Sequence, residues 1–120
     1  MRIESHRNLL VWQKAIKLSL GAYNYTRSFP RDEQYGLTSQ IRRACVSIAA
    51  NIAEGNGRRT DRDYAHFLSM AIGSAREVDT LFVMARELRL GDAAELEYCE
   101  GLLEEVDRML GTIHHRYSGK

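Results

Sequence analysis

The sequence contains little that would interrupt or crosslink a helical fold. Pro30 is the single proline in 120 residues, and long runs of β-branched residues are missing, so the composition favours an all-α chain. The two cysteines, Cys45 and Cys99, fall on apolar helical positions and lack Cys-x-x-Cys spacing. We therefore expect both to be small core residues, with a disulfide or a metal pair as the alternative.

Apolar segments of the length that membranes require are also missing. No apolar run approaches the roughly 20 residues of a membrane-spanning helix. The first residues, Met1 to Asn8, lack the apolar core of a secretory signal. The expected location is therefore the cytoplasm, with no membrane partner.

Recognisable catalytic motifs are absent too. The only glycine-rich stretch, Gly55-Asn56-Gly57, has the pattern of a helix end and not of a phosphate loop. Neither G-x-S-x-G nor H-E-x-x-H occurs, and no Glu-x-x-His pair of the di-iron type is present. His114 and His115 are adjacent, so they point to different faces of a helix. The sequence predicts a non-enzymatic protein without catalytic residues, metal or cofactor.

Four amphipathic segments fill most of the chain. Apolar residues recur every three or four positions over residues 9–27, 31–56, 61–90 and 92–117, the spacing of a buried helical face. Proline and glycine stand at the breaks between these segments, as is typical of helix starts and ends. Because the connections are short, the sequence predicts a single all-α domain over residues 1–120, an antiparallel up-down-up-down four-helix bundle.

The second segment carries a polar stripe beside its apolar one. Gln40, Ser47, Asn51 and Glu54 recur at helical spacing next to the apolar positions. Polar groups beside a core need hydrogen-bond partners, so we interpret the stripe as a network that fixes the register between helices or subunits. General acid–base chemistry by Glu54 and ligand binding are the alternatives.

The apolar arc of the same segment is wide. Val46, Ala49 and Ala53 extend it beyond the stripe that contains Ile41 and Ile48. A helix with so broad an apolar face contacts more than one neighbour. We therefore expect the bundle to associate with copies of itself.

Charge is divided unevenly along the chain. The net charge is +1, yet residues 1–62 hold 11 Lys and Arg against 5 Asp and Glu, and residues 63–120 hold 6 against 11. Basic side chains neutralise nucleic-acid phosphates, and seven are candidates for such contacts: Lys14, Lys17, Arg42, Arg43, Arg58, Arg59 and Arg62. Solvated or intersubunit arginines, and pairing of basic with acidic faces in an oligomer, are the alternatives.

One pattern near the end of the chain resembles an enzyme motif. Arg108 followed by His114 resembles the R-x(4–6)-H motif of HEPN ribonucleases, whose two side chains activate the RNA 2′-hydroxyl and stabilise the charged phosphate. Met109 stands where that family usually has a polar residue, and a regular helix aligns Arg108 with His115 instead. A chance match is the favoured interpretation.

A longer pattern resembles a known bacterial family. It includes Leu10 to Ala15, Phe29-Pro30, Tyr35 to Ala44, Val46 to Ile48, Asn51 to Gly55, Gly57-Arg58 and Phe67 to Ser74. In order and residue type, these segments are similar to four-helix-bundle proteins encoded in intervening sequences of large-subunit ribosomal RNA genes. The resemblance covers about residues 8–90, and the last segment is similar only in character.

That resemblance implies a four-helix bundle that assembles as a homopentameric barrel and has no catalytic residues. A related member, the accessory variability determinant of diversity-generating retroelements, binds a reverse transcriptase and nucleic acid through basic surfaces. The present chain differs from that strongly basic member because its net charge is only +1 and its last segment is acidic.

The basic first half and the resemblance together predict a function. We expect a non-enzymatic oligomeric bundle that acts as an accessory protein and binds RNA or a ribonucleoprotein. The expected partners are copies of the chain itself and RNA, or a nucleic-acid-handling protein such as a reverse transcriptase. The alternatives are a purely structural protein–protein interaction module and a ribonuclease that uses Arg108 and His114.

Overall fold

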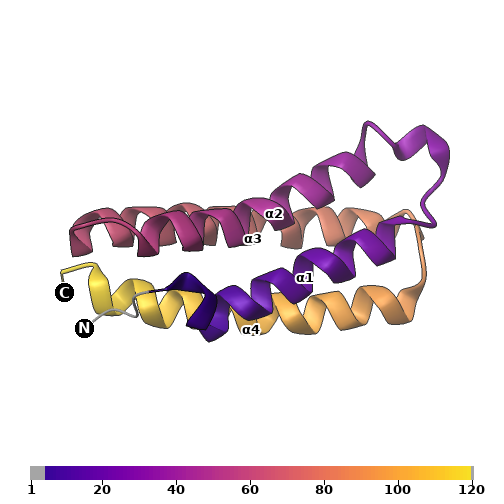
Figure 1. Cartoon of the computed structure of the whole chain (residues 1–120). Helices are drawn as coiled ribbons and strands as arrows, with labels where there is room; N and C mark the ends of the chain where they lie inside the picture. Colours follow the sequence, from indigo (N-terminus) through magenta and orange to yellow (C-terminus); the bar gives the residue numbers. More distant parts are fainter. Residues whose placement is uncertain (1–4, 120) are drawn as a thin grey trace.

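The computed structural model describes residues 5–119 as a set of four helices with short connections. Helix α1 spans Leu10–Thr26, α2 spans Leu37–Asn56, α3 spans Asp61–Glu87 and α4 spans Ala93–Tyr117. Two 3₁₀ turns, η1 (His6–Asn8) and η2 (Arg31–Glu33), precede α1 and α2. Consecutive helices run in opposite directions along a body of 45 × 20 × 20 Å (Figure 1). The predicted all-α four-helix bundle is confirmed.

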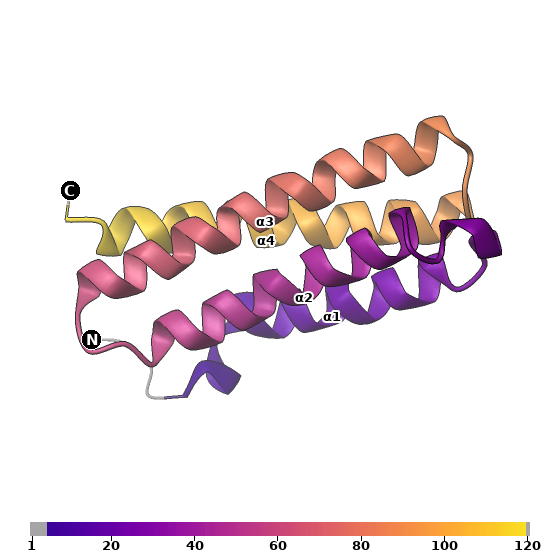
Figure 2. The ribbon, with the colours of Figure 1, turned by 90° about the horizontal axis from the view of Figure 1, so that it is seen from above.

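The four helices close a ring around a shared core. Helix α1 packs against α2 and α4, and α3 packs against the same two helices. The α2–α3 turn and the end of α4 lie at one end of the bundle, and the α1–α2 and α3–α4 connections lie at the other (Figure 2). These are called the Arg58 end and the Tyr25 end, after one residue in each.

Helix α2 begins later than the sequence predicts. Residues 31–36, expected at its start, form η2 and a turn, and the helix begins at Leu37. The Glu33 carboxylate accepts a hydrogen bond from the Leu37 amide at 3.2 Å. Gly36 has φ −106° and ψ −116°, which lies outside the helical region. Glu33 therefore caps α2 from outside it, and the chain before Leu37 does not join the helix.

The other helix boundaries lie close to the predicted ones. The largest difference is at the end of α3, which stops three residues early because Arg89 adopts a left-handed φ of 57°. The Leu90 amide then donates to the Ala85 carbonyl at 3.0 Å, which closes the helix end. Side chains of Thr60 and Asp92 cap the starts of α3 and α4.

The predicted apolar stripes form the core. The largest fully buried side chains are Val11, Leu18, Tyr25, Ile41, Ile48, Ile52, Tyr64, Leu68, Val78, Phe82, Val106 and Leu110. Cys45 and Cys99 are buried with free thiols, as expected for small core residues. Burial raises the pKa of the Cys45 thiol to about 12 and that of Cys99 to about 11. Both thiols are therefore protonated, and poor nucleophiles, at neutral pH.

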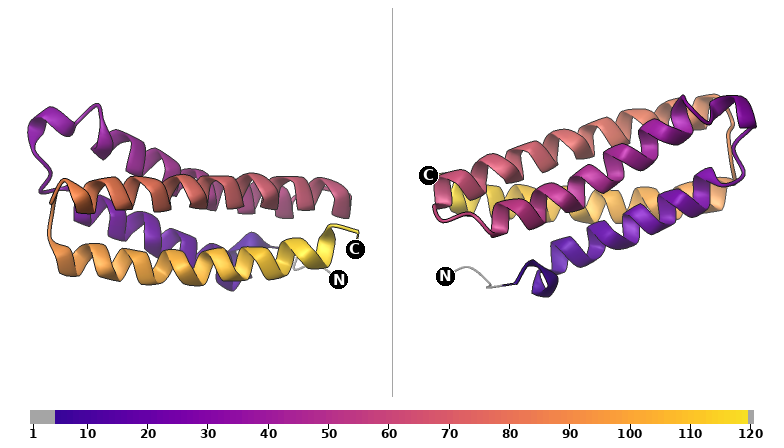
Figure 3. Two further views of the ribbon diagram at one scale, coloured as in Figure 1. Left: turned by 180° about the vertical axis from the view of Figure 1, so that it is seen from behind. Right: turned by 45° about the horizontal axis from the view of Figure 1, so that its top comes forward.

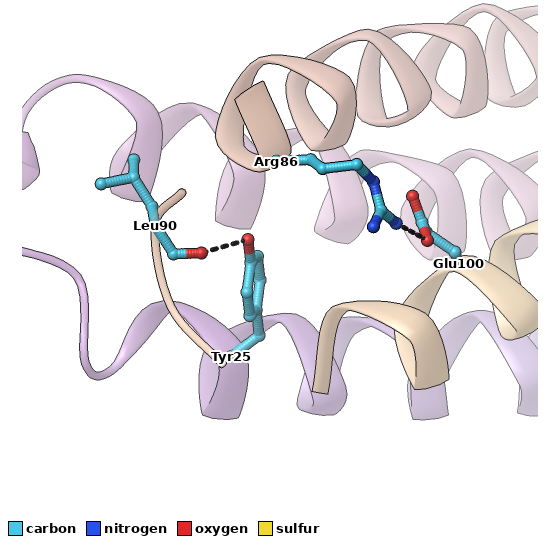
Figure 4. A network of polar contacts seen from close by, with 4 residues as sticks. All are labelled: Tyr25, Arg86, Leu90 and Glu100. Atoms are coloured by element: carbon cyan, nitrogen blue, oxygen red, sulfur yellow. Dashed lines mark hydrogen bonds and ion pairs between the residues drawn. The ribbon is translucent and has the colours of Figure 1, made fainter. Parts of the chain in front are cut away.

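Tyr25 of α1 forms a hydrogen bond and close packing contacts with the α3–α4 connection. Its hydroxyl donates to the Leu90 carbonyl at 2.8 Å (Figure 4), and its ring meets Phe29 edge to face, with centroids 4.9 Å apart. Gly91 has a φ of 71°, and a Cβ there would lie 2.5 Å from the Tyr25 ring. The close packing requires glycine at this position. The Tyr25 end is thus closed by a specific, tightly packed contact.

An ion pair joins α3 to α4 beside this contact. Figure 4 shows the Arg86 guanidinium directed at the Glu100 carboxylate. Burial raises the pKa of the nearby Tyr25 hydroxyl to about 12, so this phenol donates its hydrogen bond throughout the neutral range.

Among residues 5–119, no helix is both long and apolar enough to cross a membrane.

Candidate nucleic-acid interface

The polar stripe of α2 divides into separate contacts. The hydroxyls of Ser47 and Ser74 lie 2.9 Å apart, which links α2 to α3. The Asn51 side-chain amide donates to the Ser47 carbonyl at 2.9 Å and to its hydroxyl at 3.1 Å. The network foreseen from the sequence is therefore present at Ser47 and Asn51, where it connects two helices of one chain.

Gln40 and Glu54 do not belong to that network. Gln40 is exposed near the start of α2, almost two turns before Ser47. Glu54 is also exposed, and it forms an ion pair with Arg58 one turn further on, with 3.0 Å between Oε2 and Nη2. Within one chain, Glu54 therefore pairs with Arg58, which the sequence suggested as a member of the network, and Gln40 faces solvent.

Arg42 serves the packing of the bundle. Its Nε donates to the Thr26 hydroxyl at 2.9 Å and its Nη2 to the Tyr23 carbonyl at 3.4 Å. The guanidinium also lies over the Tyr23 ring, 4.4 Å from the centroid. These contacts hold α2 to α1, so Arg42 contributes to the packing of the bundle.

The α1 lysines face the acidic helix α4. The Lys14 ammonium lies 2.7 Å from the Glu105 carboxylate. This contact lowers the pKa of Glu105, and the charges of Arg108 and Lys17 act in the same direction. Charges of the basic and acidic halves of the sequence therefore pair within one chain, and Lys14 is already neutralised.

The remaining candidates lie at two distant places. Arg43 is exposed beside Tyr35, Gln40 and Glu77 around a depression on α2 and α3. Helix α2 extends 13 residues beyond Arg43, or about 20 Å, and the α2–α3 turn that follows it carries the arginine cluster. The seven candidate residues therefore do not form one continuous patch.

The arginine cluster consists of Arg58, Arg59 and Arg62. The Arg58 guanidinium lies over the Phe67 ring, 4.5 Å from its centroid, in addition to its ion pair with Glu54. Arg59 and Arg62 are exposed and form no ion pair with any residue in 5–119. Of the cluster, Arg59 and Arg62 are free to meet an external anion.

A pocket that the sequence did not reveal opens next to the cluster. The start of α3 and the end of α4 lie at the same end of the bundle (Figure 3), and a pocket of about 590 Å³ lies between them. Its charged and titratable lining residues are Asp61, Arg62, His66, His114, Arg116 and Tyr117. His66 and Arg116 were not sequence candidates, because about 50 residues separate them and only helix packing brings them together.

The ribonuclease-like pair is not assembled. Arg108 lines an apolar depression with Leu10 and Met109 between α1 and α4. His114 lines the pocket between α3 and α4. Six residues on a helix correspond to about 600° of rotation, so the two side chains leave α4 on different faces.

Within the described residues, no group of three or more His, Cys, Asp or Glu side chains is arranged to hold a metal ion. Burial raises the pKa of both thiols far above neutral pH. Both are therefore protonated, and neither acts as a metal ligand or nucleophile without structural change.

Comparison with known proteins identifies a family and a similar fold. Residues 7–112 match the family described as 23S rRNA-intervening sequence protein. A crystal structure of a protein of unknown function from the S23 ribosomal protein family of Bacteroides thetaiotaomicron is similar, with a TM-score of 0.78 and 19% sequence identity. The alignment covers 88% of this chain and 98% of that one. No protein of curated function matches.

Proposed function

The chain belongs to the 23S rRNA-intervening sequence protein family, and from that premise we propose that it is a non-enzymatic accessory protein that binds RNA through the Arg58 end. The observation that carries the proposal is the exposure of Arg59 and Arg62, which lack ion-pair partners within residues 5–119. Arginine is suited to phosphate because its planar guanidinium can donate two parallel hydrogen bonds.

The rest of the Arg58 end supports this assignment. Phe67 supports the Arg58 guanidinium, and Glu54 neutralises it only partly because that ion pair is exposed to solvent. Arg62 also borders the α3–α4 pocket, where His66, His114 and Arg116 add further donors. A strand of RNA that follows the α2–α3 turn would meet basic groups from two helices and the turn.

We also propose that the protein works as a homo-oligomer, and a homopentamer is the form that the family resemblance implies. Val46 on α2 and Met70 on α3 are 46% and 42% exposed, on two helices that the Ser47–Ser74 contact joins. Gly73, nearby on α3, has open space around its Cα, which allows another helix to approach. An oligomer would repeat the arginine cluster and so raise its affinity for a long RNA.

Light scattering at micromolar concentration tests the assembly. We expect a mass that is a multiple of 13.7 kDa, and we expect Val46→Glu to lower it because a charge cannot be buried unpaired at an apolar contact. A stable monomer for the unmodified chain would overturn this part of the proposal.

Filter binding to a structured RNA over a salt series tests the RNA-binding function. We expect the logarithm of the affinity to fall linearly with the logarithm of the salt concentration, with a slope near −0.7 to −0.9 for each phosphate contacted. Absence of binding at the lowest salt concentration would contradict the proposal. Cleavage of the RNA during the incubation would contradict the non-enzymatic assignment.

A further inference from the structure

We propose that the α3–α4 pocket binds a phosphate group of RNA, with Arg62 and Arg116 as the positive charges and His66 and His114 as further hydrogen-bond donors. The proposal rests on the RNA-binding function and assigns it a defined phosphate site beside the arginine cluster. The site is assembled from the first turns of α3 and the last turn of α4 (Figure 3).

Helix geometry directs these side chains to one place. Arg62, His66 and Ser69 follow each other at spacings of four and three residues, so they share one face of α3. His114 and Tyr117 have the same three-residue spacing on α4. The two faces meet because α3 and α4 pack side by side, and all five residues line the pocket.

The charges around the pocket favour an anion. Arg62 and Arg116 are exposed and form no ion pair within residues 5–119. Asp61 is the one carboxylate in the lining, so positive charge exceeds negative charge even with both histidines neutral. The Tyr117 and Ser69 hydroxyls add uncharged donors.

The size of the pocket fits a phosphate with part of its nucleotide. Its volume of about 590 Å³ falls within the range of roughly 300 to 1,000 Å³ that is common for small-ligand sites. The lining is open to solvent at the end of the bundle, so a nucleic-acid strand can reach it without rearrangement of the helices.

The basic residues in the last turn of α4 also have a structural explanation, because positive charge there offsets the negative end of the helix dipole. His114, His115 and Arg116 all lie in the last turn of α4, where positive charge is favourable. His115 does not line the pocket, and it is therefore the matched control. A role at the helix end alone predicts the same effect for His114 and His115, whereas phosphate binding predicts an effect only for His114.

Binding of the full-length chain to short RNAs of one sequence tests the site. The RNAs carry a 5′-phosphate, a 3′-phosphate or neither, and affinities are measured by fluorescence anisotropy. The variant His66→Gln with Arg116→Gln is compared with a control of equal composition, His115→Gln with Arg31→Gln. Arg31 is exposed at the Tyr25 end.

We expect the pocket variant to bind about tenfold more weakly than the unmodified chain. The control should keep the affinity of the unmodified chain. A loss confined to one phosphorylated RNA would identify a terminal phosphate as the ligand, and an equal loss on all three RNAs would identify an internal phosphodiester. An unchanged affinity of the pocket variant would overturn the site and leave the RNA-binding function intact.

Addition of inorganic phosphate to the unmodified chain gives an independent test that needs no variant to fold. The imidazole proton signals of His66 and His114 should shift in the NMR spectrum, and those of His115 should not. A shift without any RNA binding would retain the phosphate site and overturn the proposed function. No shift together with no RNA binding would overturn both.

Discussion

The two ends of the bundle differ in how they use their charged and aromatic side chains. At the Tyr25 end, residues 24–36 and 84–100 hold four arginines and seven carboxylates, a net charge of −3. At the Arg58 end, residues 54–69 and 108–119 hold five arginines and three carboxylates, a net charge of +2, together with three histidines. The charge of this protein is therefore polarised along the bundle axis.

The contacts at the two ends also differ. At the Tyr25 end, Tyr25 is hydrogen-bonded to Leu90 and Arg86 is paired with Glu100 (Figure 4). At the Arg58 end, Arg58 is paired with Glu54, and Arg59 and Arg62 form no ion pair among the described residues. Arg31 and Arg89 at the Tyr25 end are exposed without ion pairs as well, so the ends differ in their net charge and in the tight packing around Tyr25, and not in whether exposed arginines are present.

The largest effect on stability is expected from Gly91→Ala at the Tyr25 end. The new Cβ would have to fit 2.5 Å from the Tyr25 ring, on a backbone with a φ of 71°. Strain and repacking of this kind cost about 3 kcal/mol, which urea unfolding would detect as a lower midpoint. Gly111→Ala is the matched control, because nothing lies within 4 Å of its Cβ position; it should be neutral or stabilising.

The second-largest loss of stability is expected at alkaline pH, where Tyr25 ionises. The pKa of Tyr25 is raised from 10.0 to about 12 in the folded chain. Its contribution to stability is therefore complete below about pH 10 and is lost as the pH rises through 12, by about 2 to 3 kcal/mol. The pKa values of Cys45 and Cys99 are raised as well, so the stability that these two thiols contribute is also lost as the pH rises above about 9.

Tyr25→Phe isolates the tyrosine in this titration. The variant should be about 1 kcal/mol less stable at neutral pH, because the Leu90 carbonyl loses its donor. Between pH 10 and 12 its free energy of unfolding should fall less than that of the unmodified chain. An identical fall in both would show that Tyr25 does not titrate as its burial requires.

The smallest effect on stability is expected from Glu54→Gln at the Arg58 end. An exposed ion pair between residues four positions apart contributes only about 0.3 to 0.5 kcal/mol. The same substitution removes a carboxylate from the edge of the arginine cluster, so RNA affinity should rise about two- to threefold at low salt. A fall in affinity would indicate that Glu54 positions Arg58 for the RNA.

The fold was largely predictable from the sequence because its determinants are local. The spacing of Ile41, Ile48 and Ile52 marks the buried face of α2 without reference to any other segment. The start of α2 was not predictable in this way. Glu33 and the residues around it have a helix-like composition, and only the contact between its carboxylate and the Leu37 amide shows where the helix begins.

The candidate site was predictable only in part because it depends on pairs of helices. The arginine cluster is contiguous in sequence and was found. The packing role of Arg42 depends on Tyr23 and Thr26 of another helix, and composition alone does not reveal it. The α3–α4 pocket needs His66 and Arg116 to meet across the bundle, which no spacing along one helix can show.

We expect RNA to bind at the Arg58 end and not diffusely to positive charge. This expectation is tested most directly by comparing two double variants in filter binding across a salt series. Arg59→Gln with Arg62→Gln should weaken binding about tenfold at low salt and reduce the salt slope by about 1.4, the value for two phosphate contacts on a single strand. Arg27→Gln with Arg31→Gln, at the Tyr25 end, should leave both unchanged; equal losses in the two variants would contradict the account.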